Sequence, residues 1–394
     1  MDSVVEERRR SRKYDILLLG ATGYTGSLTA EHIVRHLPFD LKWAIAGRSK
    51  SKLESLASKL KELDPERIQP DIEVVKFDDP RQLGSVVKNS KVCISVVLYW
   101  QVGEVVVKSC VENGTDYIDV AGDIPLLRTF IDQYHEAALD ARIACSPDRK
   151  IFSPGPQRES WRRRADVSGG TASSMLAEST YDSQSLKEAK EPWVLSPIKR
   201  SQTSAPTNFL NMRKDPTLGL LSRSSFSAEQ NRALVHRTWA LLQDTDQAYG
   251  PNFEYNEYIK VSSAVGGILR LLTLVLVRGA LKFGPSRRLL GLVLPKPGEG
   301  PDVEKERASR IKFEAIATAD TGSNPVPRAY ASFSYPSGSY HTTALFLAQG
   351  AASLLYTRNL ANHVPGGCLT PAFLGEDLWK RLQNAGAVLR VNLL

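Results

Sequence analysis

Short apolar runs alternate with longer amphipathic segments over the first 145 positions of the chain. Apolar runs bounded by turn residues are typical of buried parallel strands, and the amphipathic segments between them are typical of crossover helices. The pattern predicts helices at 28–37, 51–63, 81–88, 103–112 and 125–140. It predicts strands at Ile16–Leu19, Leu41–Ala46, Ile72–Phe77, Val92–Leu98, Tyr117–Val120 and Arg142–Cys145. Six strands interleaved with helices indicate an α/β fold, a Rossmann-type doubly wound parallel sheet.

A glycine-rich turn joins the first strand to the first helix, with the sequence Gly20-Ala21-Thr22-Gly23-Tyr24-Thr25-Gly26. Gly20 permits the tight turn, Gly23 lets backbone N–H groups approach a pyrophosphate, and Gly26 lets helix and strand pack closely. The phosphates would lie at the positive end of the helix that begins near Tyr24. A glycine-rich turn of another α/β protein is the alternative. The strand before it and the helix after it favour a dinucleotide site.

The end of the second strand indicates which dinucleotide is bound. NAD enzymes usually carry an acidic residue about 20 positions after the turn, whereas NADP enzymes carry a basic residue there. Here the strand is followed by Arg48, Ser49 and Lys50, with no carboxylate between Asp40 and Glu54. Arg48 can stack on adenine and face the 2′-phosphate, Ser49 can donate a hydrogen bond, and Lys50 adds charge. These residues favour NADP(H); a basic helix start that only faces water is the alternative.

Length, charge and cysteine usage narrow the class of protein. A chain of 394 residues exceeds what one core usually supports, so we expect two domains. Part of the net charge of +8 lies in the basic run before Tyr14, which we expect to be a solvated terminus or a weak contact with an anionic surface. The four cysteines have no metal-ligand spacing and indicate buried thiols in a reducing compartment. We expect no metal site, no signal peptide and no nucleic-acid partner, and a cytoplasmic location.

The second half of the chain has a less regular pattern. Basic, proline-containing sequence at 147–165 indicates an irregular exposed loop, and Ser168–Thr171 reads as a phosphate-binding nest or, by itself, as a turn before a helix. The polar segment Pro197–Glu229 indicates a mobile surface segment.

Residues 265–294 are the most apolar part of the chain. Arginine and lysine residues interrupt this stretch, and no window reaches the roughly 20 uncharged residues that a membrane span needs. We expect a helical hairpin that packs in the core or in a homodimer, or that makes peripheral contact with a lipid surface or partner.

Several further stretches carry a resemblance to a known family. They are, with the glycine turn and in chain order, Trp43–Arg48, Gly103–Val107, Glu112–Thr115, Tyr117–Asp123, Ser168–Thr171, Lys296–Pro301 and Leu369–Gly375. On these motifs the chain resembles the saccharopine dehydrogenase-like oxidoreductases. The resemblance is to the branch that includes trans-acting enoyl reductases and fungal relatives in lipid and secondary metabolism, and it covers nearly the whole chain.

The resemblance implies a domain organisation. An NADP(H)-binding Rossmann domain would occupy 14–146, and an inserted α+β domain at 166–340 would shape the substrate cleft and often a dimer face. Residues 341–394 would return to the first domain as C-terminal helices, one of them at Asp377–Asn384. Residues 1–13 and 147–165 would remain as a basic terminus and a loop. The implied chemistry is hydride transfer to an unsaturated or imine carbon.

The chain departs from the family's pattern near the expected catalytic pocket. Where the family usually has Val-Gly-Pro-Tyr after the fourth strand, Val96-Val97-Leu98-Tyr99 keeps the tyrosine and loses the glycine and proline. Where the family usually has Cys-Gly-Phe-Asp-Ser-Ile-Pro-Ser-Asp, Cys145–Asp148 is followed by unmatched sequence, by divergence or by an incorrect exon boundary. The cofactor residues therefore carry over more fully than the catalytic ones.

Two side chains remain as catalytic candidates. Tyr99 follows the fourth strand and could donate a proton or bind a carbonyl as hydride arrives; aromatic packing beside Trp100 is the alternative. Asp123 could orient a nicotinamide amide or a substrate amine; capping the helix near Pro125 is the alternative.

Together these features predict an NADP(H)-dependent reductase of a carbon–carbon double bond in an acyl or polyketide-type intermediate. The substrate would be a small molecule or carrier-bound, with a polyketide synthase as a partner. A saccharopine-type imine reductase is one alternative, although the apolar second domain argues against it. A non-catalytic NADP-binding or lipid-surface protein is the other, motivated by the unmatched stretch after Cys145.

Overall fold

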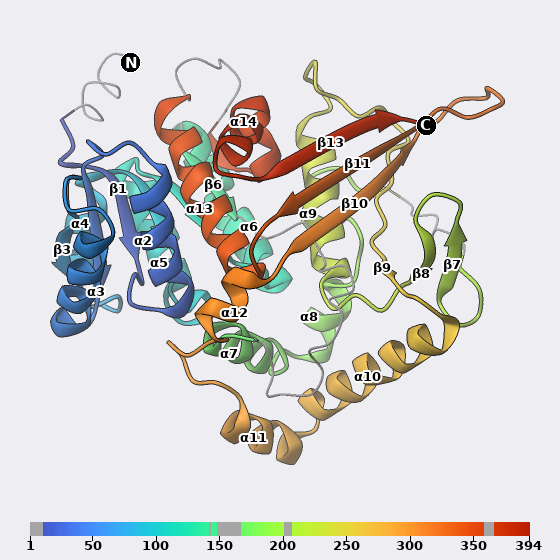
Figure 1. The fold of residues 1–394 in the computed structure, drawn as a ribbon, viewed down its shortest axis with the longest axis horizontal. Helices are drawn as coiled ribbons and strands as arrows, with labels where there is room; N and C mark the ends of the chain where they lie inside the picture. Colours follow the sequence, from blue (N-terminus) through green and yellow to red (C-terminus); the bar gives the residue numbers. More distant parts are fainter. Residues whose placement is uncertain (1–10, 142, 148–166, 201–206, 358–365) are drawn as a thin grey trace.

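The computed structural model describes residues 11–141, 143–147, 167–200, 207–357 and 366–394 (Figure 1). Its main sheet has seven parallel strands in the order β12-β6-β5-β4-β1-β2-β3. These strands are β1 (Tyr14–Leu19), β2 (Trp43–Gly47), β3 (Asp71–Val74), β4 (Ser90–Ser95), β5 (Asp116–Asp119), β6 (Ala144–Pro147) and β12 (Gly367–Cys368). The first six follow the Rossmann order 3-2-1-4-5-6, so the predicted fold class is confirmed.

Helices cover both faces of this sheet because alternate residues of each strand point to opposite sides. Ile16 and Leu18 of β1 pack in one hydrophobic cluster, and Leu17 and Leu19 pack in the other. The first cluster lies beneath α2 (Tyr24–His36), α3 (Lys50–Leu63) and α13 (Ser339–Tyr356). The second lies beneath α4 (Pro80–Val87), α5 (Glu104–Asn113) and α6 (Ile124–Asp140). The helix predictions of the first 145 residues are confirmed within a few residues at each end.

The helix α13 lies in the middle of the molecule although it comes late in the sequence (Figure 1). It packs along α2, and 14 of its 18 residues are buried. Its Gly350 approaches the sheet so closely that a Cβ there would be 2.7 Å from the side chain of Ile118. The helix α14 (Gly375–Asn384) packs against it. The C-terminal part of the chain therefore completes the core of the main sheet.

The remaining elements form two small antiparallel sheets and several helices beside the main sheet. The first sheet is β7 (Met212–Asp215), β8 (Gly219–Ser222) and β9 (Ile259–Lys260). The second is β10 (Ile311–Thr318), β11 (Arg328–Tyr335) and β13 (Val388–Leu393). The helices nearest the site are α7 (Gly169–Glu178), α8 (Ser183–Glu188), α9 (Ala228–Leu241) and α12 (Val303–Ala308).

Two parts of this region differ from the sequence expectations. Pro197–Glu229 was expected to be a mobile surface segment, but it contains β7, β8 and the start of α9. Asp215 fixes the turn between the two strands by accepting hydrogen bonds from the backbone N–H groups of Thr217 and Leu218, and Arg328 of β11 contacts its carboxylate at 3.0 Å. The predicted loop at 147–165 lies, after its first residue, outside the described residues, as do the first ten residues of the predicted basic terminus.

The apolar stretch forms two helices, α10 (Ala264–Lys282) and α11 (Gly284–Val293), at the lower edge of Figure 1. The expectation that it is buried in the core is wrong, since only Gly267 and Leu281 of α10, and no residue of α11, are buried. By length and composition alone, α10 would also qualify as a membrane-spanning helix. Both of its ends are held by the protein, because Gly267 packs against Met212 and Leu281 is buried.

Candidate functional site

The glycine turn lies at the carboxyl edge of the main sheet, between β1 and α2. Gly20 has a φ of +79°, a left-handed conformation that glycine adopts without strain, and a Cβ there would be 3.0 Å from the carbonyl of Val96. A Cβ at Gly26 would be 2.3 Å from the carbonyl oxygen of Gly20. Both positions therefore require glycine, for the turn and for close packing of α2 against the strand.

The start of α2 is built to bind an anion. Gly23 is the N-cap residue, and no described side chain caps the helix. The first turn also has no acidic residue, so its N–H groups and the positive end of the helix dipole are not neutralised by the described residues. Ala21, Thr22 and Thr25 complete the turn, with Thr22 and Thr25 half-buried. This cradle fits the pyrophosphate of a dinucleotide.

The basic residues expected at the adenosine end follow the adjacent strand. The backbone N–H of Gly20 donates to the carbonyl of Ala46 at 3.0 Å, which ties the glycine turn to the end of β2. Arg48 follows β2 and is exposed, and Ser49 and Lys50 begin α3 beside it. The structure therefore brings the predicted 2′-phosphate residues and the glycine turn to one edge of the sheet.

A loop from the second domain rests on the glycine turn. The Tyr24 hydroxyl donates to the carbonyl of Pro301 at 2.8 Å, and a Cβ at Gly300 would be 2.4 Å from the Tyr24 ring. The same loop contacts the start of α7, where the N–H of Gly169 donates to the carbonyl of Glu299 at 2.9 Å. Tyr340 at the start of α13 lies edge-on to Tyr24, with ring centroids 5.1 Å apart. Segments far apart in the sequence thus contact one another at the glycine turn.

Tyr99 lies in a π-helical turn (Tyr99–Gly103) that leads from β4 into α5. Its hydroxyl forms a hydrogen bond with Ser174 of α7, and Ser174 Oγ donates to Glu178 Oε1 at 3.3 Å. Its ring lies edge-on to Trp100 at 5.1 Å, so the packing contact also exists. Tyr99 is therefore half-buried at the carboxyl edge, with its phenol in a chain of hydroxyl and carboxyl groups.

Asp123 follows β5 and accepts hydrogen bonds from both a backbone and a side-chain group. Its Oδ1 accepts from the N–H of Leu126 at 3.2 Å, which caps α6, and its Oδ2 accepts from the Tyr181 hydroxyl at 2.9 Å. Burial and the neighbouring Asp123 carboxylate raise the pKa of Tyr181, so this phenol keeps its proton at neutral pH. The capping role that the sequence left open is present, and Asp123 also holds Tyr181 beside Tyr99.

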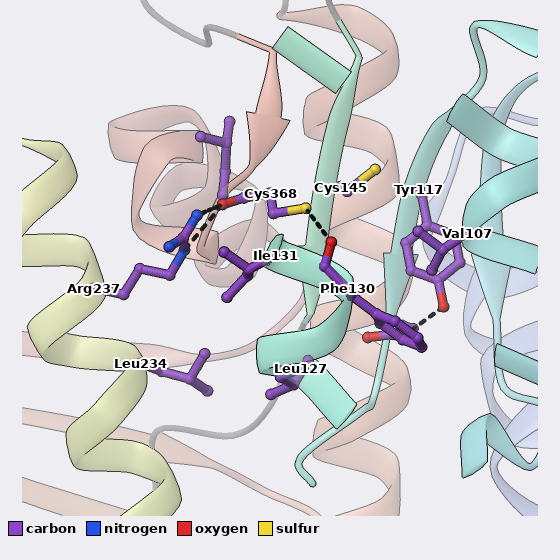
Figure 2. A pocket seen from close by; sticks show the side chains of 11 residues that line it. Val107, Tyr117, Leu127, Phe130, Ile131, Cys145, Leu234, Arg237 and Cys368 are labelled. Atoms are coloured by element: carbon purple, nitrogen blue, oxygen red, sulfur yellow. Dashed lines mark hydrogen bonds between the residues drawn. The ribbon is translucent and has the colours of Figure 1, made fainter. Parts of the chain in front are cut away.

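A further group of buried polar side chains lies near β5, β6 and β12 (Figure 2). Asp119 accepts from the Tyr117 hydroxyl at 2.6 Å, and burial raises the pKa of Asp119 to about 7. Arg237 of α9 reaches into the group and donates to the backbone carbonyl of Cys368 at 2.7 Å. The enclosed cavity measures about 20 Å³, room for about one water molecule. It cannot hold a substrate, and the group joins β12 to the body of the protein.

The four cysteines are buried and free, as expected. Cys145 and Cys368 occupy paired positions on β6 and β12. A hydrogen bond from Cys145, with contributions from His135 and Arg237, lowers the pKa of Cys368 despite its burial. Among the described residues no group of histidine, cysteine and carboxylate side chains could hold a metal ion.

Sequence reasoning missed several residues that this site brings together. Ser174, Glu178, Tyr181 and Tyr340 lie beside the predicted positions, but each comes from an element far away in the chain. Only Ser168–Thr171, at the start of α7, gave a signal. Gly169 of this segment packs against the loop at 296–301, since a Cβ at Gly169 would collide with the Lys296 carbonyl.

Comparison with known proteins agrees with this geometry. The family model described as the saccharopine dehydrogenase NADP binding domain matches residues 16–145. Residues 16–145 are therefore similar to the NADP-binding domain of the saccharopine dehydrogenases. The resemblance seen in the sequence is confirmed, and the cofactor of this oxidoreductase is NADP(H), as Arg48 and the glycine turn predicted.

Relatives of this oxidoreductase match over almost their whole length. A trans-acting enoyl reductase of Mycobacterium tuberculosis is 29% identical over 96% of this chain and 97% of its own. That of Mycobacterium ulcerans is 27% identical over 97% and 99%. The solved structure of apo saccharopine dehydrogenase (L-Glu forming) from Saccharomyces cerevisiae covers 97% of this chain and 100% of its own, with a TM-score of 0.50 and 14% identity. The last comparison shows the shared fold.

Proposed function

We propose that this oxidoreductase reduces a carbon–carbon double bond conjugated to the carbonyl of an acyl or polyketide-type thioester, with NADPH as the reductant. The observation that carries the proposal is the hydrogen-bonded pair of Tyr99 and Ser174 at the carboxyl edge, beside the cofactor turn. Full-length similarity to proteins named trans-acting enoyl reductases supports the same reaction class. Bound NADPH would supply the hydride, and the residues of the chain supply position and protons.

Each site residue then has a role. The turn Gly20–Gly26 would hold the pyrophosphate, and Arg48, Ser49 and Lys50 would bind the 2′-phosphate. The Tyr99 phenol would hydrogen-bond the thioester carbonyl or donate the proton that completes the reduction, with Ser174 and Glu178 orienting it. Asp123 would act as a positioning residue through Tyr181. The lining beside these residues combines apolar side chains with Lys190, Arg278 and Lys282.

The enzyme would act in trans on an intermediate carried by a partner polyketide synthase, in the cytoplasm. We further propose that α10 and α11 rest on an anionic lipid surface. Their exposed leucine, valine and phenylalanine side chains lie beside Arg270, Arg278, Lys282, Arg287 and Arg288, a composition typical of an interfacial helix pair. The alternative is that a second copy of this chain packs against the same helices in a homodimer.

A cofactor titration followed by turnover tests the main proposal. Fluorescence titration should show tight NADPH binding and weak NADH binding. Arg48→Ala should weaken NADPH about tenfold to a hundredfold, because charge-assisted hydrogen bonds to the 2′-phosphate are lost, and should weaken NADH much less, because NADH loses only the stacking on adenine. Lys59→Ala, an exposed cation farther along α3, is the matched control.

The turnover assay follows NADPH oxidation with trans-2-enoyl thioesters. Tyr99→Phe should lower kcat about a hundredfold or more and leave NADPH binding intact, because the ring stays and only the phenol is removed. Binding of neither nucleotide would refute the reductase, and an unchanged kcat in Tyr99→Phe would remove Tyr99 from the chemistry.

A further inference from the structure

A cavity of about 410 Å³ lies between the start of α6 and the helices α7, α8, α9 and α10. Its volume falls within the roughly 300–1,000 Å³ typical of small-molecule sites. Its walls are chiefly apolar, with Pro125, Met175, Leu186, Phe226, Val275 and Leu281 among the lining residues. Protein interiors are otherwise close-packed, so a hollow of this size and lining indicates an apolar ligand.

One end of this cavity reaches the candidate catalytic residues. Glu178 and Tyr181 both line it. Glu178 accepts from Ser174, which is bonded to the Tyr99 hydroxyl, and Tyr181 donates to Asp123. Tyr181 therefore connects the cavity directly to Asp123, and Glu178 connects it to Tyr99 through Ser174. On the α10 side, the lining combines Val275 and Leu281 with the cations Arg278 and Lys282.

The helix α10 forms the outer wall of the cavity, and its position at the edge of the molecule is visible in Figure 1. Val275 contributes to this wall although 59% of its surface is exposed, so the cavity opens to the exterior along α10. Arg278 lies at the same rim and pairs with Glu229 of α9 at 3.5 Å. An apolar chain that filled the cavity could continue past this rim onto the exposed face of α10.

We propose that this cavity holds the hydrocarbon chain of the acyl substrate, with the enoyl end at Tyr99 and the distal end at α10. The assignment rests on the proposed enoyl reduction and adds the substrate class: a medium or long alkyl chain in place of a short or polar acyl group. The carrier would then approach from the side of Tyr99 that faces away from the cavity.

Chain-length dependence gives the first test. In turnover of butenoyl, octenoyl and dodecenoyl N-acetylcysteamine thioesters, kcat/KM should rise with each added methylene by at most about fourfold, the equivalent of about 0.8 kcal/mol per buried CH2. A kcat/KM that does not change with chain length would overturn the proposal.

Filling the cavity gives the second test. Gly279 lines it, and a Cβ at Gly279 meets no described atom within 4 Å, so Gly279→Phe places an aromatic ring there without a backbone clash. We expect the ratio of dodecenoyl to butenoyl kcat/KM to fall at least tenfold. Gly284→Phe at the start of α11 is the matched control, because a Cβ there is equally unobstructed and the residue does not line the cavity. Equal ratios in both variants would refute the assignment.

A binding measurement separates the cavity from the reaction. The fluorescent fatty acid cis-parinaric acid should bind the wild type and Gly284→Phe, and should bind Gly279→Phe at least tenfold more weakly; NADPH titration verifies that each variant is folded. If no enoyl thioester is reduced but this pattern holds, the proposed reaction fails and the chain-binding cavity stands. If thioesters are reduced but parinaric acid binds all three proteins equally or none of them, the cavity assignment fails alone.

Discussion

Asp119 carries the strongest pH dependence that a single described carboxyl group gives this protein. It is buried, with the Tyr117 hydroxyl and the Ala121 N–H as hydrogen-bond donors, and burial raises its pKa to about 7 from its ordinary value of 3.8. Between these two values the folded state holds a proton that the unfolded state has released. The contribution of Asp119 to the free energy of unfolding therefore falls as the pH rises from about 4 to 7, by several kcal/mol in total, and stays low above 7.

Asp119→Asn should remove this slope. The amide carbonyl still accepts from Tyr117, and no charge has to be buried, so the variant should gain about 2–4 kcal/mol relative to wild type between pH 4.5 and pH 8. Urea unfolding at several pH values measures the difference. Asp132→Asn, a largely exposed carboxyl on α6, is the control and should give a curve parallel to wild type. A parallel curve for Asp119→Asn as well would mean that Asp119 does not titrate in this range.

At the scale of elements, the helices α10 and α11 expose many large apolar side chains. Leu276 and Leu292 are 71% and 83% exposed. Replacing both by glutamine should lower partitioning onto vesicles of phosphatidylcholine and phosphatidylglycerol at least tenfold, because buried apolar area supplies interfacial binding. Val391 and Leu393 on β13, 72% and 88% exposed, receive the same change as the control.

Cosedimentation with vesicles measures the partitioning, and analytical ultracentrifugation without lipid measures dimerisation, the alternative role of these helices. Wild-type protein that ignores vesicles but dimerises, with dimerisation lost in the Leu276 and Leu292 variant, would assign these helices to a homodimer instead.

The elements show what sequence pattern can predict. The early strands were predictable because most of them bury an apolar run beneath the neighbouring helices, although β3 is only partly buried. The strand β12 was not, since it has two residues and exists only because β6 offers it an edge. The hairpin of β7 and β8 was also missed, because its order comes from the Asp215 turn and from Arg328, over a hundred residues away. The cofactor turn could be predicted locally, whereas the contacts of Tyr99, Asp123 and Tyr24 depend on the whole fold.

At the scale of the molecule, the main sheet depends on the end of the chain. The helix α13 covers one face beside α2, and β12 extends the sheet beyond β6. A fragment of residues 1–147 would expose the apolar surface that α13 buries, including Leu18 and Ile118. Large uncovered apolar faces leave a domain without a cooperative core.

We therefore expect the 1–147 fragment to bind the dye ANS, to unfold without a cooperative transition and to bind NADPH at least a hundredfold more weakly than the full chain. Circular dichroism, urea unfolding and the NADPH titration would check these three properties. Joining residues 339–394 to the fragment through a flexible linker should restore cooperative unfolding. A fragment that unfolds cooperatively without them would show that the Rossmann sheet is self-sufficient.

The contact between Tyr24 and Pro301 can couple cofactor binding to the position of α11. The loop that ends at Pro301 leaves α11 directly, so one continuous segment connects the exposed helix pair to the turn that holds the cofactor. An event that displaces α11 would alter this contact, and a cofactor that fixes the turn would restrain α11. Thermodynamic reciprocity requires the two effects to be equal in free energy. The NADPH dissociation constant, measured with and without vesicles, would then show whether α10 and α11 contact the lipid surface.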